Sequence, residues 1–129
     1  MELKTPLLGK KKILIVDDNA INVMVFVNFL DGLDVEIKTA ENGFMALSLI
    51  REYNPDVILM DVHMPVLDGI EAILKIREEN SIVAIIAISA SQMYDEKNKS
   101  IMAGANIFLP KPIKRDVLQK TIFELLNGE

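Results

Sequence analysis

The segment Ile13–Phe29, ILIVDDNAINVMVFVNF, joins a short run of large apolar residues to a pattern with helical spacing. Its first part, Ile13–Val16, contains only Ile, Leu and Val, which is typical of a strand buried on both faces. Apolar residues then recur at every fourth position, at Ile21, Val25 and Phe29. This spacing places them on one face of a helix, and Asn19 is suited to be its N-cap. The segment therefore predicts a buried strand that leads directly into a helix.

The same alternation of strand and helix patterns continues to the end of the chain. Further strands are expected at Val35–Ala40, Val57–Met60, Ile82–Ile88 and Ile107–Leu109. The helical patterns between and after them place these side chains inward: Ala46, Leu47, Ile50, Ile70, Ile73, Leu74, Val117, Leu118, Ile122, Leu125, Leu126 and the stem of Arg77. The helix at about Gln92–Met102 is polar and only weakly amphipathic. Five strands that alternate with five helices predict an α/β fold, a doubly wound parallel sheet with right-handed crossovers. Chain order alone leaves the Rossmann and flavodoxin-like strand orders open.

Composition limits the classes of protein that fit. A chain of 129 residues is the size of one domain. It has no cysteine, which excludes disulfides, thiol catalysis and thiolate metal sites. Its single histidine, His63, excludes the usual histidine clusters for zinc. The net charge of −5 argues against general binding to nucleic acid, which needs an excess of Lys and Arg.

The first residues and the longest apolar run of the sequence bear on the cellular location of the protein. Residues 1–10 are expected to be a leader or an added segment, with its basic end in solvent, and residues 11–129 the domain itself. The longest apolar run, Ile82–Ile88, is too short to cross a bilayer, and no signal-peptide pattern opens the chain. We therefore expect a cytoplasmic domain that makes no membrane contact.

Polar residues follow four of the predicted strands where each strand ends. Asp17 and Asp18 follow the first strand, Asp61 the third, Ser89 the fourth and Lys111 the fifth. In a parallel sheet these ends lie at one edge, so the side chains should converge. Three carboxylates in one small site repel one another unless a cation is bound. An all-oxygen ligand set without thiolates suits Mg²⁺, which combines one or two carboxylates with phosphate oxygens and water.

This set of side chains is suited to phosphoryl transfer. A lysine supplies a mobile positive charge for a phosphate, and a serine supplies a hydroxyl donor. An ionised aspartate can itself be the nucleophile and needs no general base. Each residue alone has a plainer explanation: Asp-Asp-Asn is common in turns and helix caps, and Ser89, Lys111 and His63 could simply be surface groups. The coincidence of four matched strand ends favours a site, and no role is assigned to the side chain of His63.

These residues resemble the receiver domain of two-component response regulators over about Lys11–Asn127. The matching motifs are Val16-Asp17-Asp18-Asn19, Met60-Asp61-Val62-His63-Met64-Pro65 with Asp68-Gly69, Ile88-Ser89-Ala90, Gly104-Ala105 and Phe108-Leu109-Pro110-Lys111-Pro112. The resemblance implies a flavodoxin-like (βα)₅ fold with strand order 2-1-3-4-5. Asn19 and Asn22, in Asp-Asp-Asn-x-x-Asn, make the chain most similar to receivers of hybrid histidine kinases.

The resemblance also implies a phosphoacceptor and a metal site. Asp61 would take a phosphoryl group from a phosphohistidine on a histidine kinase or a histidine phosphotransfer protein. Asp18 and Asp61 would bind Mg²⁺ directly, Asp17 would act through water, and the backbone carbonyl of His63 would be another ligand. Mn²⁺ could substitute for Mg²⁺. The domain would be a signalling switch, not an enzyme with a separate substrate, although it would catalyse its own phosphorylation and dephosphorylation.

The remaining motif positions would stabilise the phosphoryl group and switch the surface. Lys111 would pair with the phosphoryl group, aimed by a cis bond to Pro112. Ser89 would move to bond a phosphoryl oxygen, and Phe108 would turn inward. Such a change would alter the surface of the fourth helix, fifth strand and fifth helix, where a downstream protein would bind. His63 and Ser91 occupy positions that tune the phosphoryl lifetime in the family.

Other functions stay open at this point. The domain could stand alone or be part of a larger kinase. A Mg²⁺-dependent phosphatase with an aspartate nucleophile would need a second aspartate where His63 stands. A flavodoxin-like cofactor binder is disfavoured because the chain has no tryptophan, only two tyrosines and no Gly/Ser/Thr-rich phosphate loop after the first strand. A pseudo-receiver that binds partners without phosphorylation is disfavoured by the presence of Asp61 and Lys111.

Overall fold

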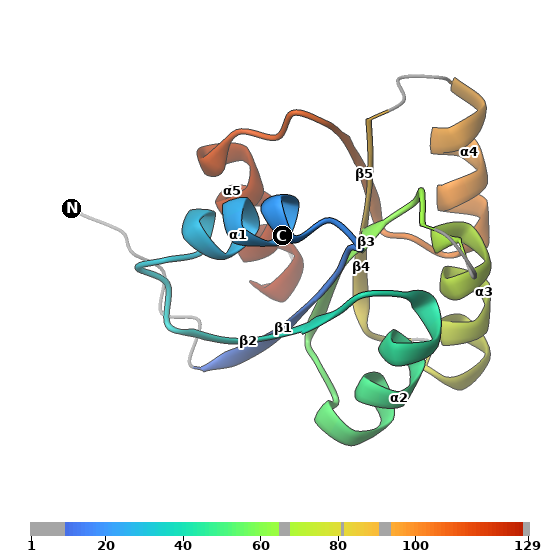
Figure 1. The fold of residues 1–129 in the computed structure, drawn as a ribbon, viewed down its shortest axis with the longest axis horizontal. Coiled ribbons are helices and arrows are strands. Elements are labelled where there is room, and N and C mark those ends of the chain that lie inside the picture. Colours follow the sequence, from blue (N-terminus) through green and yellow to red (C-terminus); the bar gives the residue numbers. More distant parts are fainter. Residues whose placement is uncertain (1–9, 65–67, 81, 91–93, 128–129) are drawn as a thin grey trace.

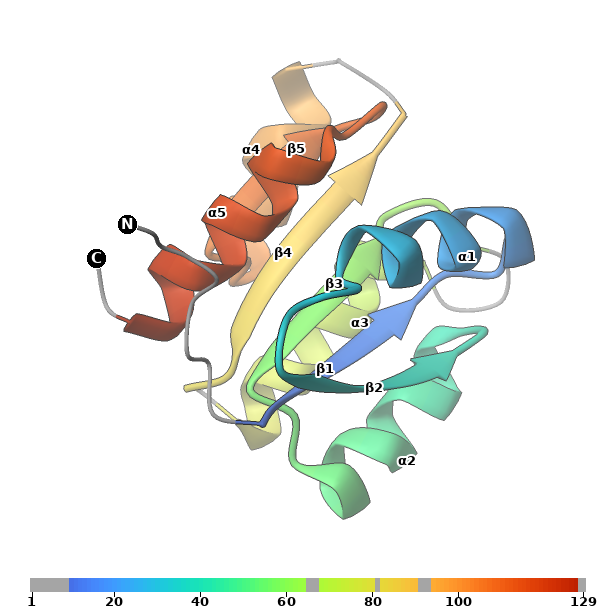
Figure 2. The ribbon, with the colours of Figure 1, turned by 90° about the vertical axis from the view of Figure 1, so that its left-hand side faces the viewer.

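The computed structural model describes residues 10–64, 68–80, 82–90 and 94–127, and these residues form alternating strands and helices (Figure 1). The elements are β1 (Lys11–Val16), α1 (Ala20–Phe29), β2 (Val35–Ala40), α2 (Gly43–Tyr53), β3 (Val57–Asp61), α3 (Gly69–Glu79), β4 (Ala84–Ser89), α4 (Tyr94–Ala103), β5 (Ile107–Pro110) and α5 (Arg115–Asn127). All strand pairs are parallel, in the order β2-β1-β3-β4-β5 (Figure 2). This confirms the doubly wound fold and the flavodoxin-like strand order.

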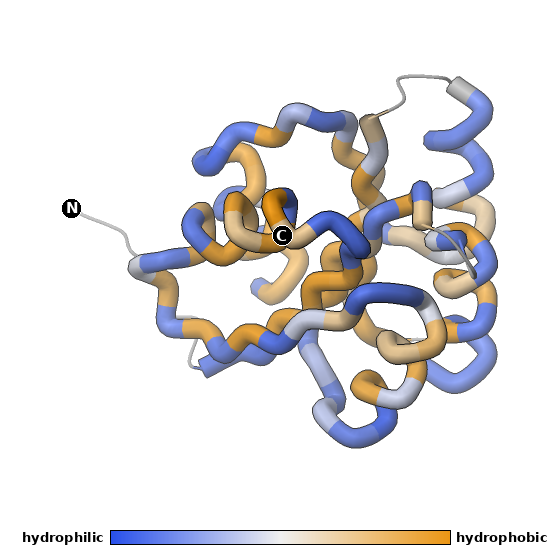
Figure 3. The backbone as a smooth tube through the Cα atoms, viewed as in Figure 1, coloured by the Kyte–Doolittle hydropathy of each residue, from blue (hydrophilic) through white to orange (hydrophobic). Residues whose placement is uncertain are grey.

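The helices cover both faces of the sheet. α1 and α5 lie on one face, and α2, α3 and α4 lie on the other (Figure 1). Because successive side chains of a strand point to opposite faces, β1 contributes to two cores. Leu14 and Val16 pack with α2 and α3, whereas Ile13 and Ile15 pack with α1 and α5. The central strands are apolar and α4 is mostly hydrophilic (Figure 3), which confirms the polar character predicted for this helix.

The fourfold spacing of apolar residues does not mark the buried face of α1. Ile21 is 71% exposed and Val25 is 41% exposed, whereas Phe26 and the following Leu30 are buried against the sheet. Apolar residues occupy nearly every position of α1, so their spacing does not identify the buried face. The helix is confirmed, but the face that carries Ile21 and Val25 is not the buried one, and a set of apolar side chains faces solvent.

Smaller corrections concern α3, β4 and α5. Ile73 is buried as predicted, but Leu74 is half exposed, and Ala72 and Ile76 pack in the core instead. β4 begins at Ala84, because Ile82 is 89% exposed and lies before the paired residues. Val117 is partly exposed, unlike the buried Leu118 and Ile122. In each case the apolar run extends beyond the part of the element that contacts the core.

Several predictions lie outside the described residues. They concern most of the leader at residues 1–10, the start of the fourth helix at Gln92, and Ser91. Within the described part of the chain, no helix is both long enough and apolar enough to span a membrane.

Polar side chains cap three helices on the side where the strands end. Asn19 accepts hydrogen bonds from the first amides of α1, as predicted, and Asn42 does so for α2. Asp68 accepts from the backbone N–H of Glu71 at 2.9 Å and so fixes the start of α3. These caps satisfy helix amides that have no partner within the helix. The turns between strand ends and helices are thereby held in place.

Candidate functional site

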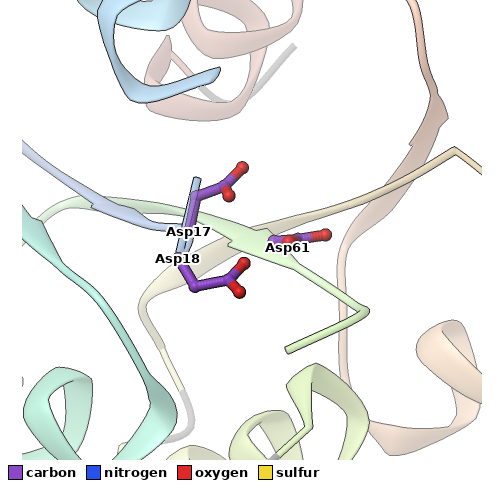
Figure 4. A group of neighbouring side chains, drawn as sticks. All are labelled: Asp17, Asp18 and Asp61. Carbon is purple, nitrogen blue, oxygen red and sulfur yellow. The ribbon is translucent and has the colours of Figure 1, made fainter. Parts of the chain in front are cut away.

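The carboxyl ends of β1 and β3 bring three aspartates together. Val16 pairs with Met60, so the residues that follow them lie side by side. The carboxylates of Asp17, Asp18 and Asp61 project beyond the strand ends toward the same side (Figure 4). One oxygen of each lies within 4.8 Å of an oxygen of the other two. The predicted convergence of these residues is confirmed.

Lys111 and Ser89 reach the same edge from the neighbouring strands. Lys111 Nζ lies 3.8 Å from Asp17 Oδ2 and 3.8 Å from Asp61 Oδ1. The backbone N–H of Lys111 donates to the carbonyl of Ser89 at 2.7 Å, which joins the ends of β4 and β5. The peptide bond between Lys111 and Pro112 is cis, as predicted. Phe108 is partly buried against the core on the α2 and α3 side.

Asp17 is the most enclosed of the acidic groups. Its Oδ1 accepts a hydrogen bond from the backbone N–H of Asn19 at 2.9 Å, a turn that aims the carboxylate into the site. Its buried Oδ2 accepts no hydrogen bond from any residue that the structure describes, and Lys111 compensates its charge at 3.8 Å. Asp18 is exposed. The same dipeptide thus supplies one buried and one solvent-facing carboxylate.

Asp61 is surrounded by groups that act on its charge in opposite directions. Its side chain is buried, and burial together with the carboxylate of Asp17 raises the pKa of Asp61 to about 6. Lys111 and the backbone N–H of His63, which donates to Oδ1 at 3.3 Å, lower the pKa by a smaller amount. The raised pKa shows that negative charge at Asp61 is incompletely compensated by the protein alone.

These carboxylates fit a hard divalent cation. The donor set is entirely oxygen, one buried oxygen of Asp17 lacks a hydrogen-bond donor within the described residues, and the charge of Asp61 is only partly balanced. Mg²⁺ prefers such ligands. The arrangement is compatible with the predicted Mg²⁺ site, whereas the division into direct and water-mediated ligands stays a prediction, as does the ligand role of the His63 carbonyl.

Gly69 brings the start of α3 against the backbone that follows Asp61. A Cβ atom at Gly69 would lie 2.3 Å from the carbonyl oxygen of Asp61 and 2.6 Å from the Cα of Val62. The backbone N–H of Gly69 donates to the Val62 carbonyl at 2.9 Å. In the sequence, Asp68-Gly69 was one of the motifs that resemble a receiver domain, and no role was assigned to the glycine. In the structure, the missing side chain at Gly69 is what allows α3 to begin beside the site.

Glu96 of α4 is a further residue of the site that sequence reasoning missed. Its carboxylate accepts a hydrogen bond from the hydroxyl of Ser89 and lies 2.5 Å from Nε2 of His63. The Glu96 side chain is only 14% exposed. The sequence offers no signal for this contact, because Glu96 is one of several charged residues in a polar helix. Its position depends on how α4 packs beside the strand ends.

Comparison with known proteins identifies the family. Residues 13–123 match the response regulator receiver domain, so the chain belongs to this family. It is 37% identical to hybrid signal transduction histidine kinase B of Dictyostelium discoideum over 91% of the chain and 7% of that kinase. It is also 33% identical to the sensor histidine kinase RcsC of Escherichia coli over 85% of the chain and 12% of that kinase. The chain therefore spans only a small part of these relatives.

Solved structures agree with this assignment. The chemotaxis protein CheY4 of Vibrio cholerae superposes with a TM-score of 0.85 at 28% identity, covering 91% of this chain and 99% of that one. The receiver domain of Ssk1 from Saccharomyces cerevisiae, solved with the histidine phosphotransfer signaling protein Ypd1, gives a TM-score of 0.82 at 34% identity, covering 90% and 88%. The chain is a receiver domain of two-component and phosphorelay signalling.

Proposed function

We propose that Asp61 is the phosphoacceptor of this receiver domain and that its donor is a phosphohistidine on a histidine kinase or a phosphotransfer protein. The observation that carries the proposal is the convergence of Asp17, Asp18 and Lys111 on the buried carboxylate of Asp61. Of the three aspartates, Asp61 is the one within reach of both Lys111 and the His63 amide. The match to the Ssk1 receiver, whose structure includes Ypd1, supports a protein donor of this kind.

In the proposed reaction, an oxygen of the Asp61 carboxylate forms a bond to phosphorus. The bond from phosphorus to the donor imidazole nitrogen breaks, and its electron pair stays on that nitrogen. Lys111 is placed to pair with the transferred group because its Nζ already lies 3.8 Å from Asp61. Ser89, at the end of β4, would supply a hydroxyl donor to a phosphoryl oxygen.

Asp17, Asp18 and Asp61 would hold Mg²⁺ at this edge, with Mn²⁺ as a substitute. When bound, the cation would neutralise charge on the phosphoryl oxygens and on the acidic cluster. The protein contributes fixed positions for the carboxylates: the Asn19 amide orients Asp17, and β3 pairing fixes Asp61.

The exposed apolar side of α1 is proposed as the docking surface for the phosphodonor. Ile21, Met24 and Val25 are exposed there. Beside them lies a groove of about 500 Å³ lined by Asn22, Val25, Phe26, Phe29, Ala90, Lys111, Pro112 and Ile113. The groove reaches Lys111 and therefore borders the site. An apolar helix surface next to the phosphoacceptor suits a helical donor protein that must bring its histidine close to Asp61.

The output surface is proposed to be the α4, β5 and α5 face, where Ser89 and Phe108 would transmit phosphorylation to a downstream partner. The receiver domain is proposed to occupy residues 11–129 and to work in the cytoplasm. The whole protein is either this domain alone or a hybrid kinase that contains it. The similarity to hybrid signal transduction histidine kinase B and to the sensor histidine kinase RcsC favours the hybrid kinase.

Intact mass after incubation with acetyl phosphate tests the phosphoacceptor assignment. Wild type with Mg²⁺ should gain one phosphoryl group, and omission of Mg²⁺ should prevent the gain. Asp61→Asn should not be modified, whereas the matched control Asp95→Asn, on the exposed side of α4, should behave as wild type. Wild type that binds Mg²⁺ and beryllofluoride but never gains mass has a short-lived adduct, and wild type that binds neither overturns the proposal.

A further inference from the structure

We propose that Glu96 is a positioning residue that holds Ser89 in an unphosphorylated arrangement and must release it before Ser89 can contact a phosphoryl group. The inference rests on the proposed function of Asp61 and adds a residue of α4 to it. Ser89 is fully buried at the end of β4, and its hydroxyl donates to the Glu96 carboxylate. Glu96 thus connects α4 directly to the phosphorylation site.

The contact with Glu96 competes with the proposed contact to the phosphoryl group. A serine hydroxyl carries one proton and can donate it to one strong acceptor at a time. A carboxylate is a charged acceptor, and hydrogen bonds to charged groups are about twice as strong as neutral ones. Ser89 therefore cannot donate fully to a phosphoryl oxygen on Asp61 while it donates to Glu96. Breaking the Ser89–Glu96 bond is a cost of activation.

A second contact of Glu96 involves the loop that follows Asp61. Its Oε2 lies 2.5 Å from His63 Nε2, and the backbone N–H of His63 donates to Asp61 Oδ1 at 3.3 Å. Glu96 therefore holds both sides of the site, the β4 end through Ser89 and the β3 end through His63. A phosphoryl group would bring further negative charge toward the Glu96 carboxylate, and the repulsion would favour its release.

The structure provides space for the released side chain. Beside Glu96 is a cavity of about 270 Å³ whose lining includes Asp68, Ile70, Asp95 and Lys99. Lys99 would offer the carboxylate a cation away from Ser89. The hydroxyl of the buried Ser100 donates to the backbone carbonyl of Glu96 at 2.8 Å, one turn earlier in the same helix. Because Glu96 belongs to α4, release of its side chain would free this helix, which is proposed for output, from Ser89 and His63.

Two alanine variants test this proposal. Glu96→Ala removes the contact with Ser89 and should raise the affinity for beryllofluoride, measured with Mg²⁺, by about tenfold, the size of a hydrogen bond to a charged group. Glu52→Ala removes the same charge from an exposed position of α2 and should change the affinity less than about twofold. Alanine favours helix, so neither variant should unfold its helix. A Glu96→Ala affinity equal to that of Glu52→Ala would overturn the proposal.

A readout on the free protein separates this proposal from the phosphoacceptor assignment. Amide hydrogen exchange in α4 should be faster in Glu96→Ala than in wild type and Glu52→Ala. In a Ser89→Ala background, Glu96→Ala should add little to the rate of α4 exchange, because the hydroxyl that Glu96 binds is already absent. If wild type takes up neither phosphoryl group nor beryllofluoride, the function proposed for Asp61 fails, while this exchange pattern still decides the role of Glu96. Equal α4 exchange in all variants would refute that role.

Discussion

Asp61 is a carboxylate whose surroundings disfavour its charge when no cation is bound. Its pKa rises from 3.8 to about 6, mainly because the side chain is buried and then because Asp17 is near. The folded protein therefore holds this proton more tightly than the unfolded chain does. The contribution of Asp61 to the free energy of unfolding should therefore be most favourable below pH 3.8 and should be lost as the pH rises through about 6. The full effect is roughly 3 kcal/mol, at about 1.4 kcal/mol per pKa unit.

Asp61→Asn should consequently stabilise the protein in Mg²⁺-free buffer at pH 7. We expect the free energy of unfolding in urea to rise by about 1 to 3 kcal/mol, because the amide carries no charge. At pH 4 the difference should nearly vanish, since Asp61 is then mostly protonated in the folded state. The exposed Asp95→Asn serves as control and should change stability by less than about 0.5 kcal/mol. A destabilised Asp61→Asn at pH 7 would contradict this description of the site.

A second prediction at the scale of single residues concerns Gly69. Gly69→Ala should destabilise the protein by about 2 kcal/mol or more, because its Cβ would collide with the backbone of Asp61 and Val62. Glu71→Ala, an exposed change in the same first turn of α3, should cost less than about 1 kcal/mol. Urea unfolding measures both values. An equal, small effect of the two substitutions would show that α3 can move away from Asp61 without cost.

At the scale of elements, α1 shows what sequence patterns cannot decide. The strands, the Asn19 cap and the carboxyl-end residues were predictable because buried β-strands, helix caps and parallel topology each leave a local signal. The spacing of apolar residues did not identify the buried face of α1, since such residues surround the helix and packing against the sheet selects Phe26. Glu96 was missed for a related reason: its contacts with Ser89 and His63 depend on the tertiary placement of α4.

The proposed docking surface on α1 can be tested with two equivalent valines. Val25 and Val27 are 41% and 39% exposed, but only Val25 lines the groove beside Lys111. Val25→Glu should slow phosphotransfer from a phosphohistidine protein by about tenfold, whereas Val27→Glu should have little effect. Both variants should react with acetyl phosphate at the wild-type rate, because that donor needs no docking surface. Equal effects of both substitutions on protein-dependent transfer would place the donor elsewhere.

At the scale of the whole molecule, the sheet lets four distant segments form one charged site. Mutual repulsion of the aspartates that follow β1 and end β3 should destabilise the folded protein when no cation is bound, and Mg²⁺ should reverse this. At a free Mg²⁺ concentration about 100 times the dissociation constant, wild type should gain about 2.7 kcal/mol. Asp61→Asn should gain less, since it lacks one carboxylate ligand. Thermal unfolding with and without Mg²⁺ measures the difference, and an equal gain in both proteins would argue against Asp61 as a ligand.

Chemical location of the phosphoryl group tests most directly whether Asp61 is the phosphoacceptor. The phosphorylated protein is treated with sodium borohydride, which reduces an aspartyl phosphate to homoserine, and the peptides are then sequenced by mass spectrometry. If Asp61 is the phosphoacceptor, phosphorylation with Mg²⁺ should give homoserine at position 61 and leave Asp17 and Asp18 unchanged. Homoserine at position 17 or 18, with Asp61 intact, would contradict the assignment of Asp61 as the phosphoacceptor.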